Sequence, residues 1–565
     1  MDRNIINNLD NELTINIVSQ KHGIKIIDAN TSIKVINYQN IAKYVNQGFF
    51  VYIDHNGQQF IAVNNCNILP NLLNSTLKIT LIKKHDFHLI LEQNFSHLNT
   101  VKAKYWLDFI TFTPTTKNIN FLKITIGFNI LFFSCLFEST TIFHLLNNLC
   151  YFTQNMLKIF LFKQSIINNC DLLIPLSQND RASRIKLPTY TILVPLYQEA
   201  AKLESIINSL VSLNYPKHLL DIKIIIEADD YLLVNLLANY NLPFYIQVLI
   251  VPYSIPRTKP KALNYAITYA RGEYVTIYDA EDQPEPDQLL KVVNAFQQLP
   301  KEFACIQAKL SFYNAHENLL TKFFSIEYTI WFEYLLKGLS LYNFPVPLGG
   351  TSNHFKADIL RIIGYWDAYN VTEDAELGIR LYAHGYKTHI IDSYTFEEAP
   401  ITIDNWINQR SRWIKGFIQT FAIFVAYKPK RTTFTYLQII VTYIFIGLST
   451  YSFYCFPWLI IIVIINSNPT IDYLWLINSF FALVYSYSAA LYALYANNKS
   501  ENKKRFHLLD YLGLIFWPLY FILHSVASYK AMWEIIRKPF AWNKTQHGIS
   551  TQDNDKLLIN VDQDS

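Results

Sequence analysis

The chain has 565 residues and 51% hydrophobic residues, so it is too long for one ordinary core and predicts two soluble domains plus a membrane part. Its formal net charge of +4 is small and its basic residues are scattered, which gives no indication of nucleic-acid binding. The six cysteines form no CxxC pair and lack metal-binding spacing, so we interpret them as reduced and structural.

Residues 1–118 combine short apolar runs with helix-like stretches, which predicts a small N-terminal α+β domain. The segment QFIAVNN, followed by LPNLL and KITLIKKHDFHLILEQNF, resembles the N-terminal domain of type II secretion ATPases. In that family such modules dock protein partners, and some bind a cyclic dinucleotide. No Arg- or Gly-rich nucleotide motif occurs here, so the resemblance implies a passive docking role with a protein partner.

Residues 119–165 are expected to form a transmembrane hairpin. Residues 121–137 read FLKITIGFNILFFSCLF and, with their flanks, could cross a hydrocarbon core of about 30 Å. Residues 141–162 carry more polar side chains, so a second span and an interfacial helix both stay open. A hairpin would place the N-terminal and central domains on the same side of the membrane.

Residues 185–430 alternate apolar strand-like runs with helical stretches. The strand-like runs lie at 190–195, 223–227, 247–251 and 274–278. This order predicts βα units around a parallel sheet, in which ligands bind at the carboxyl ends of the strands. The polar residues that follow each strand are therefore candidates for a functional site.

Residues 435–530 are apolar again and predict C-terminal transmembrane helices, followed by a tail at 531–565. The candidate spans lie at 437–465, 474–496 and 508–526. The loop at 497–505 is basic and is therefore expected in the cytoplasm. Three spans would leave the basic tail outside, so one C-terminal segment is a candidate interfacial helix and the number of spans stays open.

Asp279 and Glu281 directly follow the strand-like run at 274–278, in the sequence YDAED. Both side chains can turn toward one ion at a bend, and carboxylate oxygens are the hard ligands that Mg²⁺ or Mn²⁺ prefers. Asp282 is a possible substitute ligand. The alternative interpretation is a solvated acidic turn before Pro284.

Further polar candidates close the neighbouring strands, namely Pro195, Glu199, Asp229, Asp230, Lys261 and Asn264. Either aspartate could accept hydrogen bonds from a base or ribose, with Glu227 as a competitor, or could cap the next helix. Lys261 could neutralise a diphosphate and Asn264 could bind the nucleotide, although both also fit the solvated face of an amphipathic helix.

The segment INQRSRWIKG follows these motifs. In a helix, Gln409, Arg412 and Trp413 would share one face. Arginine suits a diphosphate, and tryptophan suits the apolar face of a sugar ring. The alternative is an amphipathic helix whose tryptophan packs in a core.

The motifs YDAED, GGTSN, TED and QRSRW, taken in order, resemble the membrane-embedded family 2 glycosyltransferases, which include cellulose synthase-like enzymes. The resemblance implies an α/β GT-A (Rossmann-like) catalytic domain inserted between transmembrane helices. It also implies that Asp374 is the general base and that Asp279 and Glu281 bind Mg²⁺ or Mn²⁺. The strand-end residues would contact the nucleotide, and Glu373 with the QRSRW face would contact the acceptor and diphosphate.

The expected activity is inverting transfer from a nucleotide sugar, with a UDP-sugar as the expected donor and a glycan or lipid-linked acceptor. The resemblance implies processive polysaccharide synthesis by a multi-pass protein of the inner (plasma) membrane, with the catalytic domain in the cytoplasm. One alternative is transfer of a single sugar to a lipid carrier. The other is a non-enzymatic envelope scaffold or receptor.

Overall fold

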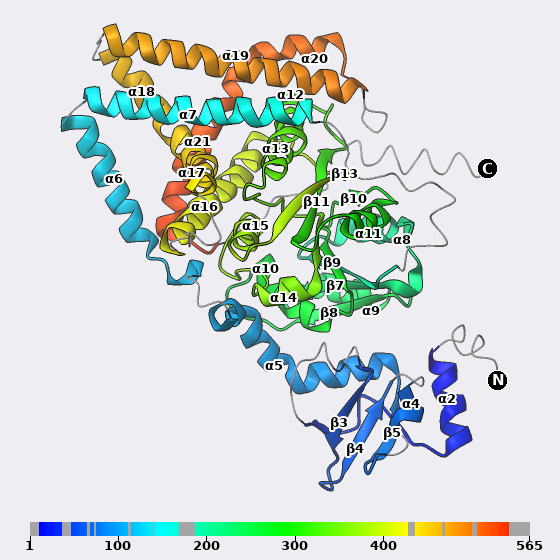
Figure 1. The fold of residues 1–565 in the computed structure, drawn as a ribbon. Coiled ribbons are helices and arrows are strands. Elements are labelled where there is room, and N and C mark those ends of the chain that lie inside the picture. Colours follow the sequence, from blue (N-terminus) through cyan, green and yellow to red (C-terminus); the bar gives the residue numbers. More distant parts are fainter. Residues whose placement is uncertain are drawn as a thin grey trace.

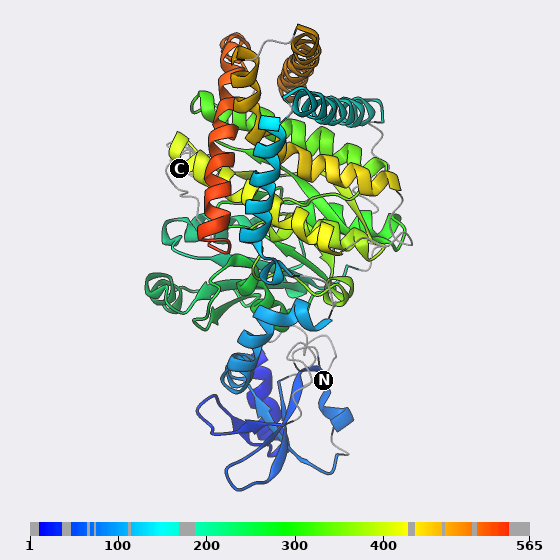
Figure 2. The ribbon, with the colours of Figure 1, turned by 90° about the vertical axis from the view of Figure 1, so that its left-hand side faces the viewer.

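The computed structural model describes residues 11–36, 44, 47–64, 68–72, 75–110, 115–138, 140–168, 187–427, 436–465, 469–499 and 506–541. The small N-terminal domain lies at one end of the molecule, and the central domain lies between it and the long apolar helices (Figures 1 and 2). Most of the basic loop expected in the cytoplasm, and the tail beyond residue 541, lie outside the described residues.

The N-terminal domain is the α+β module that the sequence predicts. Its five-stranded sheet has the order β1-β5-β4-β3-β2. Its elements are α2 (Asn11–His22), β1 (Ile26–Ile27), β2 (Lys34–Val35), β3 (Phe49–Ile53), β4 (Gln59–Val63), α4 (Leu69–Leu72), β5 (Lys78–Ile82) and α5 (Lys84–Ile110). The helix α5 covers one face of this sheet, where Phe87 packs on Phe50, and then continues to the central domain (Figure 1).

The central domain is built on an eight-stranded sheet with the order β10-β13-β11-β12-β9-β6-β7-β8. Its strands are β6 (Tyr190–Leu196), β7 (Leu220–Glu227), β8 (Ile246–Val251), β9 (Tyr274–Ile277), β10 (Gln283–Pro284), β11 (Phe303–Phe312), β12 (Asn353–Lys356) and β13 (Lys387–Glu397). Strands β6 to β9 are parallel, as predicted, and β7 is buried along its whole length, which is why it reads as a continuous apolar run. The sheet is mixed because β12 pairs antiparallel to both β9 and β11.

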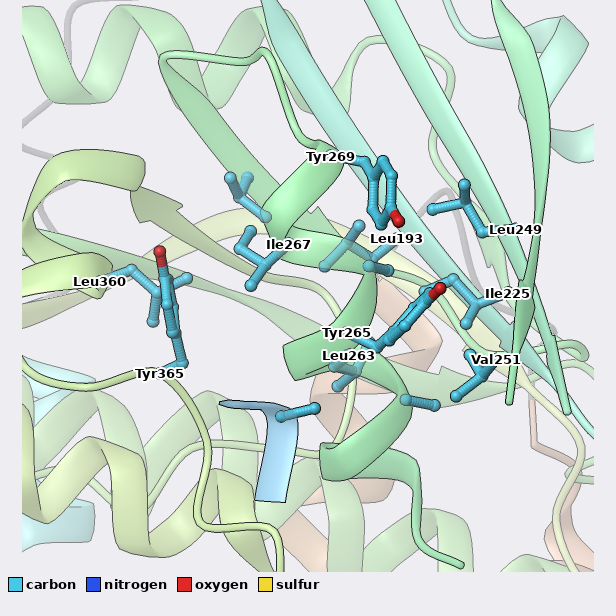
Figure 3. Packing of buried hydrophobic residues seen from close by; sticks show 14 of the residues in the cluster. Leu193, Ile225, Leu249, Val251, Leu263, Tyr265, Ile267, Tyr269, Leu360 and Tyr365 are labelled. Atoms are coloured by element: carbon cyan, nitrogen blue, oxygen red, sulfur yellow. The ribbon is translucent and has the colours of Figure 1, made fainter. Parts of the chain in front are cut away.

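Helices cover both faces of this sheet. They include α8 (Leu203–Ser212), α9 (Tyr231–Ala238), α10 (Lys259–Ala266), α11 (Gln288–Gln298), α12 (Leu319–Thr329), α14 (Ala357–Ile362) and α15 (Glu373–Ala383). Figure 3 shows Leu263 and Tyr265 of α10 beside Ile225 and Val251 of the sheet. The same apolar cluster includes residues of α5, so the N-terminal domain is fixed against α10.

The remaining long helices are apolar or amphipathic. They are α6 (Phe121–Glu138), α7 (Thr140–Ile167), α16 (Ile403–Tyr427), α17 (Tyr436–Thr442), α18 (Ser449–Ile465), α19 (Pro469–Lys499), α20 (Leu508–Gly513) and α21 (Trp517–Arg537). Three segments of the described chain are long and apolar enough to cross a membrane, namely Tyr436–Trp458, Tyr473–Asn498 and Asp510–Arg537. They overlap the three predicted C-terminal spans.

The N-terminal hairpin stays a prediction. Its first helix contains a shorter apolar segment, Phe121–Ile130, and its second helix is not among the three candidate spans of the described chain. In the structure α6 packs on α21 and α7 packs on α19, so both helices join the C-terminal apolar group.

Candidate active site

One cavity of about 700 Å³ opens at the carboxyl ends of β6, β7 and β9 and continues between the apolar helices. It is bounded by the sheet on one side and by α15 and α16 on the other. The sequence-predicted residues that line it are Pro195, Glu199, Asp279, Glu281, Glu373, Asp374, Gln409, Arg412 and Trp413. Motifs spread over more than half of the central domain therefore meet in one space.

Asp279 and Glu281 leave β9 and line the cavity, but Asp282 does not. A carboxylate oxygen of Asp282 accepts hydrogen bonds from the Asp279 backbone N–H, at 2.7 Å, and from the Thr351 hydroxyl. Asp282 is 1% exposed and holds the turn closed. The turn is therefore not a solvated one, and the role of Asp282 as a substitute metal ligand stays a prediction.

Lys259, the first residue of α10, is a cavity residue that sequence reasoning missed. Its Nζ lies 2.5 Å from Oδ1 of Asp279 and donates to the Gly350 carbonyl at 2.8 Å. Burial lowers the pKa of Lys259, but Asp279 and Glu373 outweigh it and raise the pKa above its ordinary value. The ammonium group therefore stays charged and links the YDAED turn to the GGTSN turn.

Burial and mutual repulsion perturb the carboxylates of the cavity. Burial, reinforced by Asp279, raises the pKa of Glu281 to about 7. Burial, reinforced by Asp374, raises the pKa of Glu373 to about 8. Burial also raises the pKa of Asp374. The cavity thus gathers more carboxyl groups than basic side chains, and a bound cation would favour the ionised forms of these carboxyl groups.

Asp279 and Glu281 fit a hard divalent cation by the chemistry of their donor atoms. No group of three or more ligating side chains occurs among the described residues. A cation held by these two carboxylates would therefore keep other ligand positions for oxygen atoms from water or phosphate.

Glu373 and Asp374 occupy the first turn of α15, directly after the N-cap residue Thr372. Oδ1 of Asp374 accepts a hydrogen bond from the Ala375 backbone N–H at 2.7 Å. Oδ2 of Asp374 lies 3.2 Å from the position that a Cβ atom on Gly350 would occupy. The GGTSN turn therefore passes directly beside this carboxylate.

The QRSRW segment lies in α16, and the predicted common face of Gln409, Arg412 and Trp413 lines the cavity. Burial lowers the pKa of Arg412, and the carboxylates of Glu373 and Asp374 oppose this effect. Trp413 stacks on Phe324, with ring centroids 5.9 Å apart and planes 18° apart. The helix therefore turns a cation toward the carboxylates and an aromatic ring toward the wall of the cavity.

Arg410 is a second residue that the sequence did not single out. Its guanidinium group donates to both carboxylate oxygens of Glu327, at 3.0 and 2.7 Å, and lies 4.6 Å from the centroid of the Trp413 ring. Both charged residues line the cavity. Because Glu327 lies on the distant helix α12, no local sequence pattern could have paired them.

The two aspartates after β7 do not line the cavity. Asp229 forms an ion pair with Arg257 at 2.8 Å, and Arg257 itself lines the cavity. Asp230 caps α9 by accepting from the Leu233 backbone N–H at 3.4 Å, and it also accepts from the Gln198 N–H at 2.5 Å. Asp230 therefore caps α9, as the alternative interpretation has it, and its contact with a nucleotide stays a prediction.

Lys261 and Asn264 also lie away from the cavity. Lys261 is fully buried, and its Nζ lies 2.7 and 2.9 Å from the carboxylate oxygens of Glu227, which does line the cavity. The Asn264 amide donates to the carbonyls of Ala103 and Trp366, at 3.0 and 2.8 Å. Both are structural residues, because α10 turns its first residue toward the cavity and these two toward the interior.

The described architecture is that of a GT-A fold, a mixed α/β sheet with acidic strand ends that face a cavity. Residues 191–356 match the model of Glycosyl transferase family 2, and residues 274–497 match that of Glycosyl transferase family group 2. Both models describe glycosyltransferases, and between them they match residues 191–497.

Curated relatives are similar over this part of the chain. "Probable glycosyltransferase YdaM" of Bacillus subtilis is 28% identical over 271 residues, which are 46% of this chain and 64% of the relative. "Beta-monoglucosyldiacylglycerol synthase" of Nostoc sp. is 27% identical over 243 residues, 42% of this chain and 50% of the relative. "Probable glucomannan 4-beta-mannosyltransferase 6" of Oryza sativa is 26% identical over 271 residues, 46% of each chain. The matched region thus spans between 46% and 64% of these relatives.

Proposed function

We propose that the protein is an inverting glycosyltransferase that transfers a sugar from a nucleotide sugar to an acceptor at the membrane. The observation that carries the proposal is the single cavity in which Asp279 and Glu281 meet Asp374 and the QRSRW face. A UDP-sugar is the donor we expect. The catalytic domain would face the cytoplasm, where nucleotide sugars are made.

In the proposed reaction an acceptor hydroxyl oxygen forms a bond to C1 of the donor sugar while the bond from C1 to the diphosphate oxygen breaks. Asp374 takes the proton of the acceptor hydroxyl, and its raised pKa makes it a better base near neutral pH. Lys259 and Arg412 stabilise the charge that develops on the departing diphosphate. Inversion at C1 follows from this single displacement.

Mg²⁺ or Mn²⁺ would be held by Asp279 and Glu281. When bound, the cation would supply further positive charge to the leaving diphosphate. The side chains of the protein would hold the acceptor hydroxyl near Asp374 and the acceptor sugar against Trp413. Closely packed aromatic walls would limit access of water to the donor.

The shape of the cavity supports processive synthesis of a polysaccharide. Beyond Trp413 it continues between the apolar helices, where its walls include Phe445, Phe453, Tyr485, Trp517, Phe521 and His524. An acceptor chain several sugars long could occupy this extension while its end remains at Asp374. Synthesis of a polysaccharide also agrees with the name of the Oryza sativa relative.

Transfer of a single sugar to a lipid is the second candidate. The aromatic walls of the cavity between apolar helices could also hold a lipid, and the Nostoc relative carries the name of a glycolipid synthase. The N-terminal domain would dock a protein partner in either case.

Incubation of purified full-length protein with radiolabelled UDP-sugars and GDP-sugars, with and without Mn²⁺ or Mg²⁺, tests the proposal. We expect metal-dependent, high-molecular-mass product from one donor and none from Asp374→Asn. Short, solvent-extractable product alone would establish transfer to a lipid instead. Absence of transfer from every donor, together with unchanged cellular phenotypes of Asp374→Asn, would favour a non-enzymatic scaffold.

A further inference from the structure

A buried carboxylate fixes the loop that leads into the first turn of α15. Asp367 is 2% exposed, and its Oδ2 accepts hydrogen bonds from both the backbone N–H and the hydroxyl of Thr116, at 2.8 and 2.6 Å. Its Oδ1 accepts from the Tyr369 backbone N–H at 3.0 Å. Thr116 belongs to the short helix η2 (Thr116–Asn118), which lies between α5 and α6 and thus outside the glycosyltransferase domain.

The same loop is held from other sides by elements of the central domain. The Trp366 backbone N–H donates to Asn264 of α10 at 3.1 Å. The Ala368 carbonyl accepts from the Thr258 hydroxyl at 2.7 Å, and the Val371 N–H donates to Gln419 of α16 at 3.1 Å. The loop therefore lies clamped between η2, α10 and α16.

The two hydrogen bonds from Thr116 differ from the other contacts of this loop because they are donated to a buried carboxyl group. Two of the donors around the Asp367 carboxyl come from Thr116, and burying a carboxylate without hydrogen bonds is costly. If the Thr116 hydroxyl were removed, the Asp367 carboxylate would lose one of its hydrogen bonds. A shift of the loop that lets water replace this bond would then lower the free energy. Because α15 begins at Glu373, such a shift would move the carboxyl of Asp374 within the cavity.

We propose that Asp367 is a positioning residue, and that its pairing with Thr116 sets the place of Asp374 relative to Asp279. The segment that follows the N-terminal domain thereby takes part in assembling the catalytic site. This inference rests on the proposed function, because it assigns Asp374 to the reacting hydroxyl. Asp367 itself does not line the cavity.

The test compares Thr116→Val, which keeps the shape of the side chain but removes the hydroxyl, with Thr116→Ser, which keeps the hydroxyl. In full-length protein, Thr116→Val is expected to lower kcat about tenfold, since small misplacements of reacting groups are costly. The KM for the nucleotide sugar should stay unchanged, because Asp279 and Lys259 are untouched. Thr116→Ser should restore kcat, and Thr31→Val, on an exposed turn of the N-terminal domain, is the matched control.

Amide hydrogen exchange provides a readout that does not depend on activity. Thr116→Val should exchange faster than Thr116→Ser in the peptide spanning residues 366–374, with no change around Asp279. Unchanged exchange there, or an unchanged kcat in an active enzyme, would overturn the inference, as would an equal loss of donor affinity and kcat. Absence of transfer by the unmodified protein would refute the proposed function separately, and the exchange result would still decide whether Thr116 positions the loop.

Discussion

Glu281 and Glu373 retain their protons to unusually high pH because they are buried beside other carboxylates. Their pKa values of about 7 and about 8 lie above the ordinary value of 4.5. Between about pH 4.5 and about pH 8 the folded state therefore holds protons that the unfolded state releases, and the free energy of unfolding falls as the pH rises. A cation that binds these carboxylates would oppose that loss.

We therefore expect the melting temperature of the donor-free, metal-free protein to fall between about pH 6 and about pH 8.5. Glu373→Gln, which cannot ionise, should weaken this pH dependence, and added Mn²⁺ should raise the melting temperature most at the higher pH. Glu302→Gln, at a partly exposed ion pair with Lys387, is the matched control and should leave the slope unchanged. Equal slopes for both variants would contradict the assignment to Glu373.

Asp374 is expected to act on the proton of the acceptor and not on binding of the donor. Asp374→Asn should lower kcat by about 10²- to 10⁴-fold, the usual contribution of a general base. Its affinity for the nucleoside diphosphate, measured by calorimetry, should remain close to that of the unmodified protein. Asp358→Asn, at an exposed position in the first turn of α14, serves as the control. If kcat survived in Asp374→Asn, Glu373 would become the candidate base.

Helix α10 directs two lysines, which are only two residues apart in the sequence, toward different partners. Lys259 contacts Asp279 in the cavity, whereas Lys261 is buried behind the cavity wall and pairs with Glu227, whose carboxylate side chain lines the cavity. Lys259→Met should weaken binding of the nucleoside diphosphate about tenfold or more, a loss of at least about 1.4 kcal/mol, and should destabilise the fold less than Lys261→Met does, because its partner Asp279 is 30% exposed. Lys261→Met should cost about 3–5 kcal/mol of stability, because it leaves the Glu227 carboxylate buried and unpaired.

Each variant is the control for the other, since both remove one lysine charge from the same helix. Calorimetry with the nucleoside diphosphate and thermal unfolding, measured on both proteins, separate the two roles. The reverse pattern, with Lys261→Met losing affinity at unchanged stability, would mean that α10 presents its other face to the donor.

Local patterns in the sequence predict which helices and strands carry the site. They predict less well which way individual side chains on these elements point. The apolar runs identify β6 to β9, and helical spacing places Gln409, Arg412 and Trp413 on one face. The antiparallel strand β12 and the pair of Arg410 with Glu327 depend on partners distant in the chain. Whether Lys259 or Lys261 faces the cavity depends on where α10 begins, which a short Lys-Pro-Lys run does not determine.

The cavity extends from the carboxyl ends of the strands in the central sheet to the space between the apolar helices. Its far wall includes Ala489 of α19, which is 1% exposed, whereas Ala482, two turns earlier on the same helix, does not line it. If an acceptor chain extends along this wall, its length depends on the width of the cavity there. The catalytic groups at the strand ends lie outside that segment.

Ala489→Phe should therefore shorten the polysaccharide product and leave the initial rate of sugar transfer close to that of the unmodified protein. The added ring narrows the extension of the cavity but touches none of Asp279, Asp374 or Arg412. Ala482→Phe adds the same ring on α19 two turns away, at a position that does not line the cavity, and should leave the product length unchanged. Gel filtration of labelled product, with initial rates from the same reactions, makes the comparison. An unchanged length distribution in Ala489→Phe would mean that the growing chain does not pass along α19, and would favour transfer of a single sugar to a lipid.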